Sequence, residues 1–110
     1  AELSMAQALL EDGSMKVVHC PTQNRVIFVS RSLRYLVGHK KDIKTLFRWN
    51  PYQMYRFARI LEITVELNQN SCFSEDICLG KRKKVAMDFC IAPLISHGNE
   101  SEHVLIILEP

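Results

Sequence analysis

The order of apolar and polar residues along the chain predicts five strands and four helical segments. Runs rich in β-branched and aromatic residues indicate strands, whereas apolar residues spaced three and four apart indicate helices. Strands are predicted at residues 15–20, 26–29, 72–79, 85–94 and 103–108. Helical segments are predicted at residues 2–11, 33–37, 42–47 and 51–67.

The junction between the second strand and the first short helix shows the clearest change of spacing. Residues 26–29 read Val-Ile-Phe-Val and are typical of a strand, whereas residues 33–37 have apolar positions at helical intervals. Ser30 or Ser32 is expected to cap the backbone amides of this helix. Gly38 is expected to end it in the left-handed conformation.

The long helix has the strongest start signal. Asn50 fits the N-cap, Pro51 the first helical position and Gln53 the third, which together form a capping box. The side that we expect to face the sheet carries Met54, Phe57, Ala58, Leu61 and Val65. The other side carries Ile60, Ile63 and Leu67. A helix that is apolar on two sides needs two surfaces against which to bury them.

The element order predicts an α+β fold. Two strands form a hairpin around a turn at residues 21–24, short helices and the long helix follow, and three further strands form a meander. This order indicates a five-stranded antiparallel sheet with the helices on one face. The residues of the fourth strand that should face the long helix are Val85, Met87, Phe89 and Ile91.

Length, composition and charge are those of one globular domain. The 110 residues are 47% apolar and 24% charged, and the net charge of +2 does not argue for a nucleic-acid or membrane partner. We expect residues 1–110 to form one domain, with a flanking helix at 2–11 and a core at 15–109. The chain begins at Ala1 without an initiator methionine and shows no signal-peptide pattern, so we expect a piece of a longer protein that works in the cytoplasm or the nucleus.

The four cysteines give no metal or disulfide framework by their spacing. Cys20, Cys72, Cys78 and Cys90 could form two disulfides by number, but no CxxC pair is present and a zinc site would need two close pairs. We therefore predict free, mostly buried thiols in a reducing compartment.

The chain resembles a PAS (Per-ARNT-Sim) domain over residues 8–109. The resemblance is carried by residues 26–30 running into the apolar positions before Gly38, by the long helix at 51–67, and by Ile91 to Leu94 with the loop and strand that follow. It implies a sensory or interaction module of a regulatory protein. Ser30 stands where bacterial sensors often have asparagine, which is closer to animal transcription and clock regulators.

Two cofactors of that family are not expected here. The flavin-binding branch requires an asparagine-cysteine-arginine cluster at the start of the long helix, and residues 47–57 contain no cysteine. Haem-binding members place a histidine on the long helix, and no histidine lies between His39 and His97. His19 and Cys20 remain weak alternatives as iron ligands. We predict no cofactor and no metal.

Catalysis and nucleic-acid binding also have little support. Ser30 and Ser32 are explained by helix capping, and Glu75 and Asp76 are neighbours on a strand and therefore point to opposite faces. The basic run at residues 81–84 is expected to be a solvated turn. Because no aromatic residues are interleaved with it, direct contact with nucleic acid is not expected.

Two functions stay open on this basis, and a third fold is a lesser alternative. The first function is a PAS interaction module that pairs with itself or with another PAS-containing protein. Its candidate surface residues are Leu3, Leu9, Leu10, Ile60, Ile63 and Leu67. The second is a sensor that binds a small apolar ligand in its core and relays the signal to an attached output domain. Its candidate pocket residues are Phe28, Met54, Phe57, Leu61, Met87 and Phe89. The alternative fold is a profilin- or longin-like binding platform.

Overall fold

The computed structural model describes residues 3–95 and 102–110, so the polar loop predicted after residue 95 lies largely outside the described residues. In the described residues the elements are α1 (Met5–Ala8), β1 (Met15–Cys20), β2 (Arg25–Val29), α2 (Arg31–Val37), α3 (Ile43–Phe47), α4 (Pro51–Leu67), β3 (Ser71–Leu79), β4 (Lys83–Pro93) and β5 (Val104–Glu109). Each predicted strand is confirmed to within two residues at either end.

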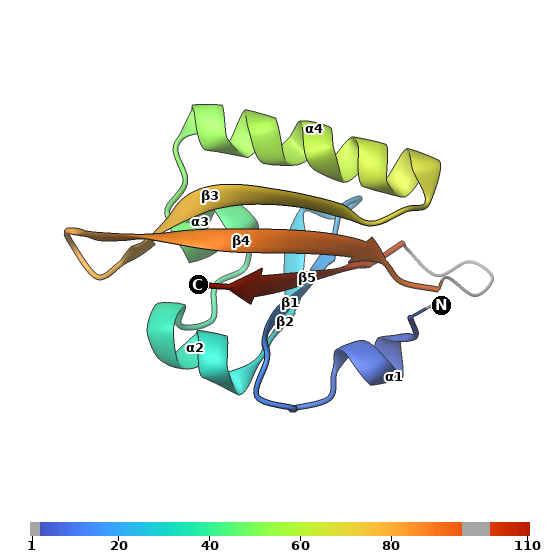
Figure 1. Cartoon of the computed structure of the whole chain (residues 1–110), viewed down its shortest axis with the longest axis horizontal. Coiled ribbons are helices and arrows are strands. Elements are labelled where there is room, and N and C mark those ends of the chain that lie inside the picture. The colour runs from blue at the N-terminus through green and yellow to red at the C-terminus, as the bar shows by residue number, and fades with distance from the viewer. Residues whose placement is uncertain (1–2, 96–101) are drawn as a thin grey trace.

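The five strands form one antiparallel sheet in the order β2-β1-β5-β4-β3. The chain enters through the β1–β2 hairpin, passes through the helices, and returns as the β3–β4–β5 meander, so that the last strand lies beside the first. Figure 1 shows the long helix α4 running along β3 and β4 on one side of the sheet. The predicted α+β class with a five-stranded antiparallel sheet is confirmed.

The helix-facing side of the sheet holds the main core. Alternate residues of β4 point to this side, and Met87, Phe89 and Ile91 are buried there with Phe57 and Leu61 of α4. The alternation predicted along β4 follows from the period of two in a strand. The short helices α2 and α3 contribute the remaining large apolar side chains of this core, which are Leu33, Ile43, Leu46 and Phe47.

The opposite face of the sheet has a smaller core under α1. Ala8 of α1 packs there with Val18, Leu94 and Leu105, and Phe28 is packed against the same cluster. The helix predicted at residues 2–11 is shorter in the structure: within the described residues of this segment, Met5–Ala8 is helical. The chain must turn after Leu9 to enter β1, and the buried Lys16 donates its Nζ hydrogen to the carbonyl of Leu10.

Neither Ser30 nor Ser32 caps α2 through its side chain, contrary to the sequence prediction: Ser30 is the N-cap without a side-chain hydrogen bond to the helix, and the hydroxyl of Ser32 donates to the carbonyl of Ser14. The hydroxyl of Ser30 donates to the carbonyl of Ser14 at 2.8 Å and accepts from the backbone N–H of Lys16 at 2.8 Å. The amide of Arg31 at the helix start donates instead to the carboxylate of Glu11. Ser30 thus fastens the end of β2 to the start of β1, where a fully buried hydroxyl needs both partners.

The long helix begins as predicted and differs in one position of its buried face. The capping box of Asn50 and Gln53 is present, and the helix ends at Asn68 in the left-handed conformation. Ala58 is exposed rather than buried, because the buried face is centred on Phe57, Leu61 and Thr64. The hydroxyl of Thr64 lies 2.8 Å from the carbonyl oxygen of Ile60 and is buried without cost.

Candidate functional site

The interior between α4 and the sheet is occupied by five aromatic side chains. They are Phe47 of α3, Trp49, Phe57 of α4, Phe73 of β3 and Phe89 of β4. Phe89 is in the middle: its ring centroid lies 5.5 Å from Phe47, 5.4 Å from Trp49 and 5.0 Å from Phe73, with which it is stacked. These separations are those of direct ring contacts. These rings therefore pack against one another in the region in which a small apolar ligand was predicted as the second possibility, and the ligand stays a prediction.

Trp49 fixes the position of this cluster, and the sequence analysis missed it. Its indole Nε1–H donates to the carbonyl of Asp76 at 2.7 Å, which ties the connection between α3 and α4 to β3. The residue follows Arg48, which has a left-handed backbone with φ of 54°. Because Trp49 belongs to neither helix, hydrophobic periodicity gives no signal for it. The signal that the sequence offers for the burial of Trp49 is its place as the single tryptophan, directly before the capping box.

Five of the six candidate pocket residues lie around this cluster. Met54, Phe57 and Leu61 approach it from α4, and Met87 and Phe89 approach it from β4. Phe28 lies elsewhere, because it pairs with Val18 on the opposite face of the sheet and packs under α1. A register shift in the β1–β2 ladder turns the neighbouring strand residues Val26 and Val29 to the main core and leaves Phe28 outside it.

Two hollows of the described surface lie away from the aromatic cluster. One, of about 340 Å³, is at the end of the sheet between the C-terminal end of α4 and the N-terminal segment, where Leu3, Val65 and Leu94 line it. The other is a shallow depression between the β1–β2 turn and Lys41-Asp42. None of the five aromatic residues lines either of them.

His19 is a buried ionisable side chain that contacts Phe57 of the main core. It is 2% exposed, its ring lies 5.9 Å from the ring of Phe57, and its Nδ1 has no hydrogen-bond partner. Burial lowers the pKa of His19 to about 4, although the backbone of Arg25 and the carboxylate of Asp42 favour the charged form. The ring is therefore neutral near pH 7. Among the described residues no cluster of three or more ligand side chains could hold a metal ion.

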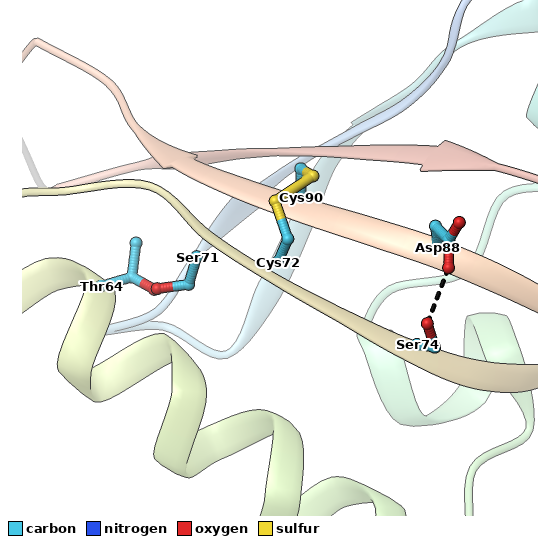
Figure 2. The surroundings of a disulfide bond; sticks show 6 residues. All are labelled: Thr64, Ser71, Cys72, Ser74, Asp88 and Cys90. Atoms are coloured by element: carbon cyan, nitrogen blue, oxygen red, sulfur yellow. Dashed lines mark hydrogen bonds between the residues drawn. A yellow bond between two sulfur atoms is a disulfide. The ribbon is translucent and has the colours of Figure 1, made fainter.

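The outer face of the β3–β4 hairpin carries a disulfide, which corrects the prediction of four free thiols. Cys72 and Cys90 are directly opposite each other in the antiparallel ladder and are bonded, whereas Cys20 and Cys78 are free (Figure 2). Both bonded cysteines are exposed. The separation of 18 residues does not reveal this disulfide in the sequence, because the bond depends on the register of the two strands.

Breaking this disulfide is expected to lower the free energy of unfolding by about 2 kcal/mol, because the bond limits the unfolded chain between residues 72 and 90. The value is below the loop-entropy estimate of about 3 kcal/mol, because residual hairpin structure in the unfolded chain already keeps the two cysteines near each other. Urea unfolding with and without a reductant measures it. The Cys72→Ser/Cys90→Ser variant should match the reduced protein and be insensitive to the reductant. Equal stability of the oxidised and reduced protein would contradict this role.

The six candidate surface residues do not form one surface. Leu3 and Ile60 are half-buried and pack against the two cores. Leu9 and Leu10 are exposed just after α1, whereas Ile63 and Leu67 are exposed on α4. Figure 1 shows α1 and α4 on opposite sides of strands β4 and β5. The chain therefore has two separate exposed apolar patches.

Of the two carboxylates considered for catalysis, Glu75 is engaged in structural contacts. Glu75 accepts hydrogen bonds from the side chains of Gln53 at 2.9 Å and Arg56 at 3.0 Å and thereby ties β3 to α4. Asp76 is exposed on the other face of the strand, as predicted from its neighbouring position. Within the described residues, no helix is long and apolar enough to cross a membrane.

Comparison with known proteins identifies the fold through solved structures alone. No protein-family model and no curated protein matches the sequence. A fungal LOV domain photoreceptor aligns with a TM-score of 0.69 at 8% identity, covering 92% of this chain and 78% of that chain. The N-terminal domain of a diguanylate cyclase with a PAS/PAC sensor from Marinobacter aquaeolei aligns with a TM-score of 0.67 at 9% identity, covering 87% of this chain and 93% of that chain.

A LOV domain of a blue-light activated histidine kinase from Erythrobacter litoralis aligns equally fully. Its TM-score is 0.64 at 10% identity, and the alignment covers 87% of this chain and 94% of that chain. At such low identities the comparisons establish the fold: the chain has the PAS/LOV architecture, not the profilin- or longin-like one. The closer resemblance to animal transcription and clock regulators stays a prediction.

Proposed function

We propose that this chain is a signalling module with the PAS fold that acts through contacts between its surface and a second PAS-fold chain. The observation that carries the proposal is the aromatic cluster around Phe89, which fills the interior between α4 and the sheet with the protein's own side chains. An interior closed in this way leaves the exposed apolar patches as the sites where the domain can receive or pass on a signal.

No catalytic activity, metal or cofactor is part of this proposal. Ser30 and Glu75, which could serve as nucleophile and base by residue type, are both held in structural hydrogen bonds. We place the protein in the cytoplasm or the nucleus. There the exposed Cys72 and Cys90 would be held as thiols, and the expected loss of about 2 kcal/mol would leave the fold intact.

Sensing of a small apolar ligand is the second candidate, and the comparisons favour it. Solved structures with this fold include light-oxygen-voltage domains, one of them described with a flavin analogue. In this chain, the corresponding function would require the ring of Phe89 or Phe57 to move aside, because both are buried in ring contacts.

Sedimentation velocity over a wide range of protein concentrations tests the proposal. We expect a concentration-dependent equilibrium between monomer and dimer. A strict monomer at every concentration would overturn self-association. If that monomer also carried a co-purified small molecule in native mass spectrometry, the sensing candidate would replace it.

A further inference from the structure

The outward side of α4 is an apolar stripe without a partner in the described chain. Tyr52 is 76% exposed, Tyr55 67%, Ile63 45% and Leu67 60%. At 3.6 residues per turn these four side chains project within about a third of the helix circumference, opposite Leu61 in the core. Figure 1 shows that no other described element lies over the outward side of α4. Four large exposed side chains on one helix face are typical of a contact surface.

Charged side chains lie among the apolar ones of this stripe and at its edge, and they are divided between its two halves. Arg56 and Arg59 lie in the N-terminal half, whereas Glu62 and Glu66 lie in the C-terminal half. A copy of the helix placed alongside in the same direction would set arginine against arginine and glutamate against glutamate. A copy placed in the opposite direction sets each arginine half against a glutamate half. The surface is thus complementary to itself under a two-fold rotation, as a symmetric dimer requires.

The antiparallel register also places aromatic side chains opposite aliphatic ones. With a two-fold axis at the level of Leu61, Tyr55 lies opposite Leu67 of the second copy, and Arg59 lies opposite Ile63 of the second copy. In the same register Arg56 lies opposite Glu66 of the second copy. The aromatic end of one stripe thereby covers the aliphatic end of the other, which buries apolar surface at both ends of the contact.

The charged residues are available for such a contact. Arg59 pairs with Glu62 of its own helix at 3.7 Å, and both side chains are more than half exposed. A solvent-exposed ion pair of this kind contributes little to the stability of a monomer. The exchange of this pair for one between two copies therefore costs little.

We propose that a second copy of this chain docks antiparallel along α4, through Tyr52, Tyr55, Ile63 and Leu67, with the arginine half of each helix against the glutamate half of the other. The inference rests on the proposed association function and names its surface. The patch at Leu9 and Leu10 lacks a comparable division of charge, since residues 3–10 contain no charged side chain. One helix pair buries an area at the lower end of specific interfaces, so the dimer is weak and concentration-dependent.

Sedimentation velocity of four variants, compared with the unmodified chain, tests this surface. Ile63→Glu is expected to raise the dimer dissociation constant at least about tenfold, because it buries a charge in the centre of the stripe. Leu10→Glu is the matched control on the α1 patch and should leave dimerisation unchanged. Thermal unfolding by circular dichroism verifies that each variant is folded; both positions are exposed.

A charge reversal provides a second and independent readout. Arg59→Glu is expected to weaken the dimer about threefold to tenfold, and Arg59→Glu/Glu62→Arg should restore it, because the double variant keeps opposite charges across the two-fold axis. If the unmodified chain dimerises while Ile63→Glu and Arg59→Glu pair as tightly, the α4 surface is wrong and the association function stands. If the unmodified chain stays monomeric at all concentrations, self-association fails and the α4 docking surface fails with it.

Discussion

Replacement of Phe89 by alanine is expected to lower the free energy of unfolding by about 3–5 kcal/mol. The ring is fully buried and has neighbouring rings at 5.0 to 5.5 Å from β3, α3 and the segment before α4. Its removal therefore deletes contacts that join three parts of the fold and leaves a cavity in a tightly packed interior. A loss of this size is a large fraction of the stability of an ordinary domain.

Urea unfolding monitored by the fluorescence of the single tryptophan measures this effect. Trp49 lies 5.4 Å from Phe89, so its emission reports directly on the packing around the substituted position. Tyr35→Ala is the matched control, because it removes an aromatic ring that is 89% exposed on the surface, and it should change stability by less than about 0.5 kcal/mol. A loss below about 1 kcal/mol for Phe89→Ala would show that the interior is not packed around this ring.

The stability of the protein is expected to fall by about 3 kcal/mol between pH 7 and pH 4 because of His19. The pKa of His19 is about 4 in the folded protein and 6.5 in the unfolded chain. Above pH 6.5 the ring is mostly neutral in both the folded and the unfolded state, so its ionisation has little effect on the free energy of unfolding. Below that pH the unfolded chain takes up a proton that the folded protein does not, so stability is lost progressively as the pH falls towards 4.

The difference between the parent protein and His19→Leu isolates this contribution. The variant has no ring to protonate, so its stability should vary much less over the same pH range. Thr45 and Ser14 lower the pKa values of Asp42 and Asp12 through hydrogen bonds, and the stability linked to these carboxylates is lost only as the pH falls below the usual range for aspartate. Both carboxylates are present in the parent protein and in His19→Leu, so their contributions cancel in the difference between the two pH profiles. His39→Leu, at an exposed position, is the control. Parallel pH profiles of His19→Leu and the parent would contradict a buried neutral ring.

The fold could be predicted from the sequence because its main signals are local. The alternation along β4 identified the buried positions Met87 and Phe89, and the capping box at Asn50 placed the start of α4. The order of the elements along the chain predicted a five-stranded antiparallel sheet, and the structure has one.

The burial of Trp49, the contacts of Ser30 and the disulfide could not be predicted, because they depend on contacts between distant segments. Trp49 lies between two helices and has no periodic neighbour that marks it as buried. Cys72 and Cys90 pair only because the β3–β4 register sets them opposite each other. The hydroxyl of Ser30 binds the backbone of β1, fourteen residues away, rather than the helix that it precedes.

The central claim is that the interior is filled by the protein's own aromatic side chains and that the domain works through its surface. Native mass spectrometry of the purified chain tests this most directly, since it weighs monomers and dimers with any bound molecule. The account predicts monomer and dimer at the mass of the polypeptide alone, with the dimer fraction rising with concentration. A monomer that carries one small molecule per chain, with no dimer at any concentration, would contradict it.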